Sequence, residues 1–339
     1  MAFQQLVRRC GSAGAALAAL PDLSRRGGRS GAPKIPSIDE AEREIAAGAA
    51  LGAVLLAACK SAFPPLLTAL DPPPPLIWAM GDIGLLQRPC VAIVGARIAS
   101  AAGQRFARGL AHDLCEAGFV VASGMARGID GAAHEGALSS GTIAVLAGGP
   151  DDIYPPEHAD LYRRLTAQAC VVSEQPPGYR ATARDFPRRN RIISGLAHAV
   201  VVVEAEARSG SLITARLAAE QGREVLAVPG SPLDPRAKGT NDLIRQGAAI
   251  CEGAEDVIRA LGTLRTLRET GDPWEPAADD PVSDTLRESV ARLLSPTPVS
   301  RDDLARATGA GAGAVGAALV ELSLAGRAEL LPGGVASSA

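Results

Sequence analysis

The chain has 339 residues, 47% of them hydrophobic and 21% charged, with a formal net charge of −3. This length and apolar content are typical of a globular protein of two or three domains and exclude a disordered chain. The slightly negative charge excludes attraction of nucleic acid by the whole surface, so such a ligand would need a local basic patch.

Six cysteines are scattered along the chain, with no CxxC pair and no histidine at the spacing of a metal ligand. We expect them to be reduced, buried thiols, which favours a cytoplasmic protein without a zinc or other metal site. The longest apolar stretch, residues 46–59, is too short to span a bilayer, so the sequence predicts a soluble protein.

The pattern of residues 1–50 predicts a few short helices. Residues 51–88 form a proline-rich segment that leads into the predicted sheet. Ser37 begins one of these helices, with acidic residues in its first turn, as the helix dipole favours. From residue 91 the pattern changes to short apolar runs separated by amphipathic helices. The candidate strands are residues 91–94, 119–122, 142–146, 170–173, 199–204, 225–228 and 249–251.

Apolar strands separated by helices predict an α/β fold with a doubly wound parallel sheet that is buried on both faces. One such helix spans residues 101–116, where Phe106, Leu110 and Leu114 recur on one face. Parallel sheets bind ligands beyond the carboxyl ends of their strands. The motifs described below all follow such strand ends.

The C-terminal part predicts a separate small domain. A polar linker, residues 263–282, leads into residues 283–339. Helices are expected at residues 283–294, after Ser300, and at residues 312–325, and Ser300 caps its helix with Asp303 three residues on. Leu330, Leu331 and a PGG turn follow. Three helices and a hairpin indicate a winged-helix-like fold.

The turn after the first parallel strand carries Gly95 and Arg97. Gly95 allows a phosphate to approach the backbone, and Ser100 can cap the next helix and leave its amides free for an anion. The turn is not GxGxxG and no acidic residue follows the second strand, so we expect no dinucleotide cofactor and assign Arg97 to a phosphate clamp. A structural turn with a solvated arginine is the alternative.

The second turn forms another glycine-rich cradle from Ser123, Gly124 and Arg127. Asp130 is expected to pair with Arg127 or Arg97 and hold it in place. Asp130 and His134 lie on one helix face, but no nucleophile or third ligand accompanies them. We therefore predict neither a catalytic nor a metal site there.

Residues 184–196 place four arginines and one phenylalanine close together in a chain with few aromatic residues. A cationic segment with a single ring suits a sugar-phosphate chain with one base stacked on that ring. The alternative is surface ion pairs around a core phenylalanine. The candidate contacts are Phe186, Arg188, Arg189, Asn190 and Arg191, with Ser209, Gly210 and Ser211 of the fifth turn and Lys238 after the sixth strand.

In order, the motifs resemble those of the DNA processing protein A (DprA/Smf) family. They are VAIVGAR, SGMARGIDGAAH, TIAVLAGGPDDIYP, SEQPPG, FPRRNRIISGLA, VVVVEA, SGSLITA, GREVLAVPG and GTNDLIRQGA. The resemblance implies an extended Rossmann-like domain over residues 51–262, between a small helical N-terminal region, residues 1–50, and a C-terminal winged-helix domain.

The resemblance also implies a non-catalytic protein that binds single-stranded DNA. Such proteins load the RecA recombinase on incoming DNA during natural transformation, in part by overcoming single-strand binding protein. Arg97, the FPRRNR residues, Ser209 and Ser211 would form the positively charged pocket. The sequence departs from the family at Ala96, where a small hydroxyl residue is usual, and in an N-terminal region that lacks the first helical hairpin.

Two other functions compete with this one. A nucleotide phosphoribohydrolase of the same fold would carry a PGGxGTxxE signature, whereas this chain has SGSLITA, with Glu204 and Glu206 ahead of the turn. A sequence-specific transcription regulator would need base-reading side chains on the third helix of the C-terminal domain, and almost none precedes Arg327.

A homodimer contact is expected at the end of the Rossmann-like domain. Leu243 and Ile244 are adjacent on a short predicted helix, and Ile250 lies on the last strand. Adjacent helix positions point about 100° apart, so one of the pair should face outward beside Ile250. Isologous pairing would cover this patch, and the resemblance points the same way. Cover by the linker or the winged helix is the alternative.

Overall fold

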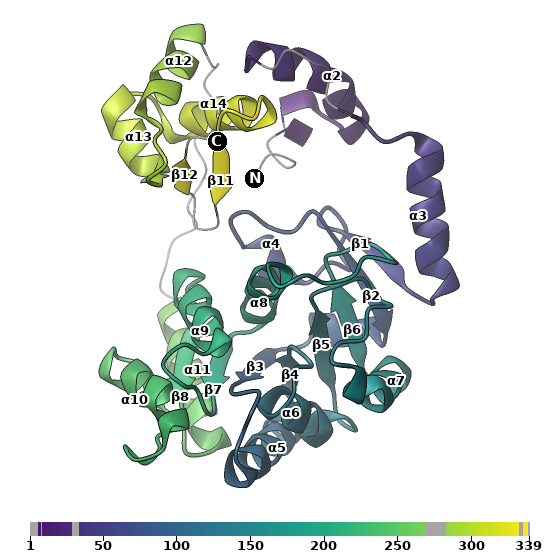
Figure 1. Ribbon diagram of the computed structural model, residues 1–339, viewed down its shortest axis with the longest axis vertical. Coiled ribbons are helices and arrows are strands. Elements are labelled where there is room, and N and C mark those ends of the chain that lie inside the picture. Colours follow the sequence, from purple (N-terminus) through teal and green to yellow (C-terminus); the bar gives the residue numbers. More distant parts are fainter. Residues whose placement is uncertain (1–5, 8, 29–33, 269–282, 332–334, 338–339) are drawn as a thin grey trace. The chain divides into compact units, whose positions relative to one another are not determined.

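The structure, a computed structural model, describes residues 6–7, 9–28, 34–268, 283–331 and 335–337 (Figure 1). Contacts divide the chain into two units. The larger unit consists of residues 39–70 and 76–271, and the smaller unit consists of residues 1–38, 71–75 and 272–339. Each unit is described by itself.

The larger unit is built on one sheet, whose strands among the described residues have the order β1-β2-β6-β5-β4-β3-β7-β8-β9. The strands are β1 (Val54–Ala57), β2 (Leu76–Gly81), β3 (Cys90–Val94), β4 (Val120–Ser123), β5 (Thr142–Leu146), β6 (Cys170–Ser173), β7 (Ala199–Val202), β8 (Glu224–Ala227) and β9 (Ala249–Ile250). Neighbours from β6 to β9 are parallel. The predicted α/β class is therefore confirmed.

The sheet is mixed, which the sequence did not predict. β1 and β2 pair antiparallel, and β2 joins the parallel strands by an antiparallel pairing with β6. Both strands lie in the segment that was interpreted as a proline-rich entry. Short apolar runs such as β1 have no periodicity that separates a strand from a buried helix, so only pairing with the rest of the sheet reveals them.

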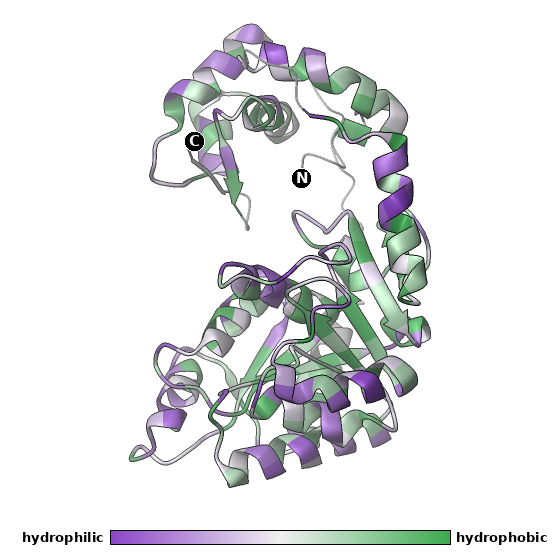
Figure 2. Cartoon of the chain, turned by 45° about the vertical axis from the view of Figure 1, so that its right-hand side comes forward, coloured by the Kyte–Doolittle hydropathy of each residue, from purple (hydrophilic) through white to green (hydrophobic). Residues whose placement is uncertain are grey.

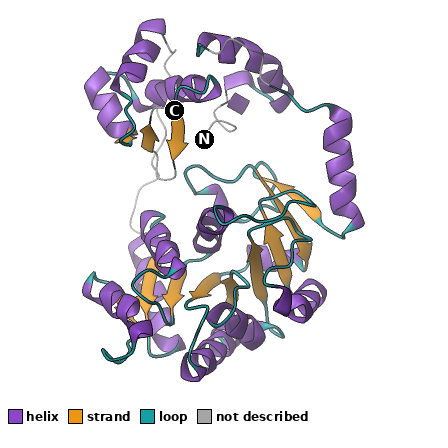
Figure 3. Ribbon diagram, in the orientation of Figure 1, coloured by secondary structure: helices purple, strands orange, loops and turns teal. Residues whose placement is uncertain are grey.

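Helices cover both faces of the sheet (Figure 3). They are α4 (Pro65–Thr68), α5 (Ala101–Glu116), α6 (Ile129–Ala137), α7 (Ala159–Gln168), α8 (Asp185–Leu196), α9 (Gly210–Glu220), α10 (Lys238–Arg245) and α11 (Ala254–Arg268). Helix α3 (Ile38–Ala50) is exposed apart from Gly48 and covers neither face. Short 3-10 turns lie at Ile83–Gln87, Pro156–His158 and Pro235–Ala237. The predicted linker 263–282 begins inside α11, and residues 269–282 lie outside the described residues.

The core has one layer on each face of the sheet. Along β3, Val91 and Ile93 belong to the cluster that contains α5 and α6, whereas Ala92 and Val94 belong to the cluster that contains α8 and α9. Because alternate strand residues point to opposite faces, a strand covered on both sides must be apolar throughout. The hydropathy colouring accordingly marks the central strands as predominantly hydrophobic (Figure 2).

The smaller unit contains the expected winged-helix arrangement. Its elements are α2 (Ala13–Arg26), α12 (Asp284–Leu293), β10 (Val299–Ser300), α13 (Arg301–Thr308), α14 (Ala312–Leu324), β11 (Glu329–Leu331) and β12 (Val335–Ser337). The strands form a sheet of order β10-β12-β11. As predicted, Ser300 caps α13, its Oγ accepting a bond of 3.1 Å from the Asp303 amide.

Helix α2 packs on α14 inside this unit. Leu23 of α2 and Val320 of α14 share one apolar cluster with Leu6 and Ala16. Glu321, on α14, is only 1% exposed and its carboxylate pairs with Arg9 at 2.8 Å and with Arg287 of α12 at 2.6 Å. The N-terminal region is therefore a structural partner of the winged helix.

The burial of the cysteines differs in part from the sequence prediction. Cys90, Cys115, Cys170 and Cys251 are buried, but Cys10 is half-buried and Cys59 is exposed, so the prediction of uniformly buried thiols was wrong for these two. Within the described ranges no single helix is long and apolar enough to cross a bilayer, and α13 with α14, bent by 109°, meets that criterion only as a pair.

Candidate nucleic-acid interface

A groove lies where the strand order reverses. The chain runs from β3 outward through β4, β5 and β6, and then returns to β7 on the other side of β3. Ligands of doubly wound sheets bind at such a switch point, beyond the carboxyl ends of the two strands. Here a groove of about 730 Å³ is lined by the loop after β3, the start of α8 and the start of α9.

Three side chains stack at the mouth of this groove. The guanidinium carbon of Arg97 lies 5.4 Å from the centre of the Phe186 ring, within cation–π range. The Tyr154 ring meets Phe186 edge to face at 5.2 Å between ring centres. Phe186 is half-buried while Tyr154 is 47% exposed and Arg97 is exposed. Phe186 therefore supports a cation and a second ring that both remain accessible.

Arg189 forms the floor of the groove and is only 8% exposed. Its guanidinium donates to the carbonyls of Val145 and of Gly124, the latter at 2.7 Å. A Cβ at Gly124 would lie 2.8 Å from the guanidinium carbon, so a larger residue there would displace the head group of Arg189. Burial lowers the pKa of Arg189 to about 10, an effect that the nearby carboxylate of Asp130 opposes. Arg189 still carries its charge at neutral pH.

Asp130 lies beside Arg189, which is neither of the two arginines, Arg127 and Arg97, that the sequence predicted as its partner. Its carboxylate accepts from the amides of Gly124 at 3.1 Å and Ala126 at 3.4 Å. Burial raises the pKa of Asp130, and Arg189 and these amides oppose the shift. The predicted pairing with Arg127 was wrong, since Arg127 pairs with Glu157 at 2.5 Å. The physical reason is that Asp130 faces inward from the first turn of α6.

The opposite wall is the start of α9. Ser209 caps this helix, its Oγ accepting from the Ser211 amide at 3.4 Å, and the two hydroxyls lie 2.7 Å apart. Asn190 donates to the Gly210 carbonyl at 3.3 Å and so ties α8 to this turn. The first turn of α9 contains no acidic residue. Its amides and dipole therefore favour an anion in the groove.

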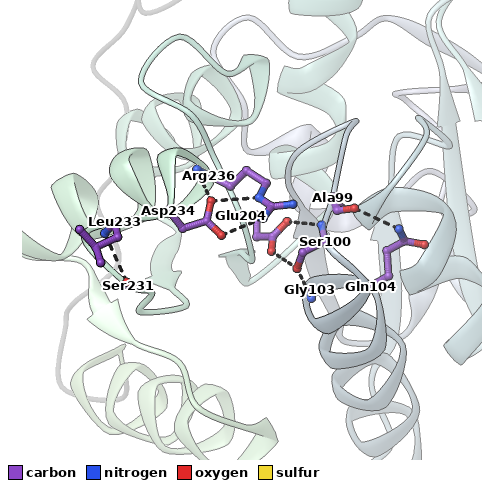
Figure 4. Close-up of polar contacts among 9 residues, drawn as sticks. All are labelled: Ala99, Ser100, Gly103, Gln104, Glu204, Ser231, Leu233, Asp234 and Arg236. Atoms are coloured by element: carbon purple, nitrogen blue, oxygen red, sulfur yellow. Dashed lines mark hydrogen bonds and ion pairs between the residues drawn. The ribbon is translucent and has the colours of Figure 1, made fainter.

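The start of α5 is different, because an internal carboxylate already occupies it (Figure 4). Glu204, just after β7, accepts from the Ser100 amide at 2.9 Å and from the Ser100 hydroxyl at 2.5 Å. Ser100 caps α5 as predicted, accepting from the Gly103 amide at 2.9 Å. The Ser100 amide is therefore not free for an external anion, because Glu204 satisfies it.

The structure brings most of the predicted contacts together and leaves others outside. The groove is lined by Gly95, Arg97, Phe186, Arg189, Asn190, Ser209, Gly210 and Ser211. Ser123 is fully buried and donates to the Ile93 carbonyl at 2.6 Å. Arg191 lies on another face of α8 and pairs with Glu174. Arg127, Arg188 and Lys238 are exposed but do not line the groove.

Sequence reasoning missed several exposed side chains in the groove wall. Among them are Ile98, Tyr154 and Arg208. Arg208 directly precedes the serine turn of α9, so its place after a parallel strand could have identified it. The pattern of the strand before it does not reveal that Tyr154, in the loop after β5, reaches Phe186 of α8. Glu206 is an acidic member of the same wall.

The predicted dimer residues lie at the edge of the sheet. Leu243 of α10 packs against the core, Ile244 is half-buried, and Ile250 is 50% exposed on the edge strand β9. The neighbouring residues of α10 thus differ in their surroundings, as the helix geometry requires.

Comparison with known proteins identifies the family. The model for DNA recombination-mediator protein A matches residues 54–262, more than half of the chain. The chain belongs to this family. Models for the DprA-like N-terminal HHH domain and the DprA winged helix domain match residues 1–47 and 275–334. The family indicated by the sequence motifs is therefore confirmed.

Relatives of this DNA recombination-mediator family resemble most of the chain. It is 40% identical to DNA processing protein DprA of Bacillus subtilis over 232 residues, 68% of this chain and 76% of the relative. It is 39% identical to Protein Smf of Escherichia coli over 293 residues, 83% of this chain and 76% of the relative.

Two solved structures of the family are similar to this one. DNA processing protein A from Streptococcus pneumoniae has a TM-score of 0.59 at 38% identity, covering 61% of this chain and 73% of that chain. The Helicobacter pylori protein has a TM-score of 0.56 at 28% identity, covering 63% and 96% respectively. That protein is reported to bind single-stranded DNA in a unique mode.

Proposed function

We propose that this protein is a non-catalytic recombination mediator that binds single-stranded DNA in the groove between β3 and β7. The observation that carries the proposal is the stack of Arg97, Phe186 and Tyr154 at the groove mouth, opposite the start of α9. Proteins that bind single strands without sequence preference combine phosphate-binding cations with aromatic platforms. The walls of this groove carry both cations and aromatic rings.

The groups divide into two kinds of contact. Arg97, Arg208 and the amides of α9 suit phosphates, because they are cationic or hydrogen-bond donors and accessible. Tyr154 presents a ring for one base, with Phe186 behind it. Arg189 gives the groove floor a positive charge, but its guanidinium donates two hydrogen bonds to backbone carbonyls. None of these groups reads a base edge in a fixed geometry, so the binding should be independent of sequence.

The biological role in the proposal follows the family. We infer that the protein hands single-stranded DNA to the RecA recombinase on incoming DNA during natural transformation, in competition with single-strand binding protein on the same strand. The family description as a recombination mediator and the single-strand binding reported for the Helicobacter pylori relative support this role.

Of the two carboxylates that could serve a phosphoribohydrolase, Glu206 lines the groove but Glu204 is engaged elsewhere, which disfavours that function for Glu204. Glu204 accepts two hydrogen bonds from Ser100 at the start of α5, on the side of the loop away from the groove. A general acid or base must be free to reach its substrate. Incubation with AMP should therefore release no ribose phosphate, and its release at a rate proportional to protein would contradict a non-catalytic role.

Salt-dependent binding tests the proposed ligand. With labelled oligothymidine and a duplex of equal length, fluorescence anisotropy should detect tighter binding of the single strand. Three phosphate contacts, at Arg97, Arg208 and the start of α9, predict a log–log salt slope of about −2, because each phosphate contributes about −0.7 for single strands. Affinity that does not change with salt, or a preference for the duplex, would contradict the proposal.

A further inference from the structure

Hydrogen bonds hold the loop that carries Arg97 on both sides of this residue. At its start, the Ala96 carbonyl accepts from the Ile129 amide at 3.2 Å. At its end, the backbone amide and hydroxyl of Ser100 donate to Glu204 at 2.9 and 2.5 Å. The Ala99 carbonyl also accepts from the Gln104 side chain at 3.2 Å, while Ile98 is 86% exposed and Arg97 is exposed. The position of Arg97 over Phe186 therefore depends on these anchors.

Backbone hydrogen bonds of its two neighbours in the chain fix the position of Glu204. The amide of the preceding residue, Val203, donates to the Val94 carbonyl at 3.0 Å. The amide of the next residue, Ala205, donates to the Arg236 carbonyl at 2.7 Å. Helix α5 accommodates the carboxylate because Gly103 has no side chain, and a Cβ there would lie 2.5 Å from the Glu204 Oε1 atom. The close-up shows the Glu204 carboxylate beside Ser100 and Gly103 (Figure 4).

The carboxylate is outside the groove whose loop it holds. Glu204 is absent from the groove lining, whereas Glu206, two residues later, is part of it. A negative charge at the first turn of a helix is favourable, so Glu204 stabilises the start of α5. Near a phosphate-binding groove, however, the same negative charge repels the ligand over a distance comparable to the screening length. Glu204 therefore favours DNA binding where it holds the start of α5 and its loop, and opposes DNA binding where it repels phosphate.

We propose that Glu204 is a positioning residue for single-stranded DNA: its contact with Ser100 holds residues 95–100 so that Arg97 faces the groove over Phe186. This inference rests on the proposed function and assigns the residue that prepares its main phosphate contact. The internal carboxylate takes the place at the start of α5 that an external phosphate has in nucleotide-binding relatives of the fold. The helix terminus thus orients a cation and does not bind the ligand.

The sign of the effect of neutralising Glu204 tests the proposal. In the full chain, Glu204→Gln keeps the side-chain volume but removes the charge that Ser100 binds. Positioning predicts that oligothymidine binding weakens about fivefold or more, by loss of a charge-assisted contact. The salt slope should become less steep by about 0.7, as one phosphate contact is lost. Repulsion alone predicts tighter binding instead.

Two further variants make the comparison specific. Glu206→Gln removes the same charge from the groove wall, and it should bind oligothymidine more tightly. Combining Glu204→Gln with Arg97→Ala should give no weaker binding than Arg97→Ala alone, since two residues that act through one contact are not additive. Circular dichroism and the thermal midpoint verify the fold of each variant. If Glu204→Gln does not fold, Ser100→Ala removes the same hydroxyl contact. This variant should then show the same weaker binding and the same less steep salt slope.

The outcomes separate this inference from the proposed function. Unchanged or tighter binding by a folded Glu204→Gln variant, or additivity with Arg97→Ala, overturns the positioning role while the groove proposal stands. If Arg97→Ala itself binds oligothymidine as well as the unmodified protein, the groove proposal fails and the positioning role fails with it. Weakening by both single variants without additivity supports both.

Discussion

The arginines of the FPRRNR segment have different surroundings, although the sequence analysis predicted the same DNA-binding role for each of them. Arg189 is buried against backbone carbonyls, Arg191 pairs with Glu174, and Arg188 is exposed away from the groove. A helix places consecutive residues about 100° apart, so one amphipathic segment cannot present all its cations to a single ligand. The segment is α8, and only one of its faces meets the groove.

Arg191→Ala should therefore affect stability more than DNA binding. It leaves the carboxylate of Glu174 half-buried without its cation, so the thermal midpoint should fall. Oligothymidine affinity should change by less than about twofold, because Arg191 does not line the groove. Arg97→Ala is the comparison, with the opposite pattern of weaker binding at an unchanged midpoint. Parallel anisotropy and calorimetry on both variants check this, and a loss of affinity in Arg191→Ala at full stability would contradict it.

His134 should make the stability of the larger unit depend on pH. It is fully buried, with Nδ1 2.7 Å from the hydroxyl of Thr142, which donates to the Val121 carbonyl at 2.7 Å. Burial holds the pKa of His134 to about 3, below its usual 6.5. The unfolded chain then binds the proton more readily, so the stabilisation is complete above pH 6.5 and is lost as the pH falls toward 3.

Urea unfolding at several pH values measures this effect. Between these two pKa values the one histidine contributes up to about 1.4 kcal/mol per pH unit to the slope of the unfolding free energy. His134→Gln removes the titrating group and should reduce the slope by that amount, even if it lowers stability at neutral pH. Equal slopes for the two proteins would show that His134 titrates normally in the folded state.

At the scale of elements, the notable pairing is α2 with α14. In a winged helix that reads duplex DNA, the third helix presents polar side chains to the major groove. Here α14 packs on the winged-helix core through Val315 and Leu319, and on α2 through Val320. A helix that is apolar on two sides must be covered on both, which gives the N-terminal region a structural role.

A pair of matched leucine variants tests this packing. Leu20 of α2 packs against the cluster shared with α14, whereas Leu17 of the same helix is 48% exposed. Leu20→Asp should expose the half-buried Cys10, which packs against that cluster, to a thiol reagent, because a carboxylate there is costly to bury. Leu17→Asp should leave Cys10 as slow as in the unmodified protein. Mass spectrometry reads the labelling, with the exposed Cys59 as internal reference. Equal Cys10 rates in the two variants would contradict the packing.

For the whole molecule, the homodimer remains a prediction. Ile244 is half-buried and Ile250 is 50% exposed at the free edge of the sheet, and edge strands of this kind invite pairing. A dimer would present two grooves to one DNA and raise the apparent affinity through effective concentration. Ile244→Glu should give a folded monomer that binds long oligothymidine more weakly.

Light scattering decides the oligomeric state. Leu233→Glu serves as the control, because Leu233 is 93% exposed in the loop after β8 and should not change the mass. An unchanged dimer mass in Ile244→Glu would rule out this interface. A mass of one chain for the unmodified protein would rule out the homodimer.

The sequence by itself determined the parallel strands from β3 to β9, the caps of α5 and α13, and the winged-helix pattern. Each of these depends on local rules: an apolar run buried on both faces, a serine before a helix, a helical repeat. The same local rules placed Arg97, Phe186 and the serine turn of α9 after strand ends, and parallel strands necessarily bring those ends to one edge.

Only the tertiary structure decided which charges serve the groove. Asp130 turned inward to Arg189, Arg191 turned to Glu174, and Glu204 filled the start of α5. Tyr154, from a loop distant in sequence, completed the stack on Phe186. The same holds for β1 and β2, which add to the far side of the sheet by antiparallel pairing. A charged or aromatic side chain takes its role from the partner that it meets, and long-range packing sets that partner while sequence spacing does not.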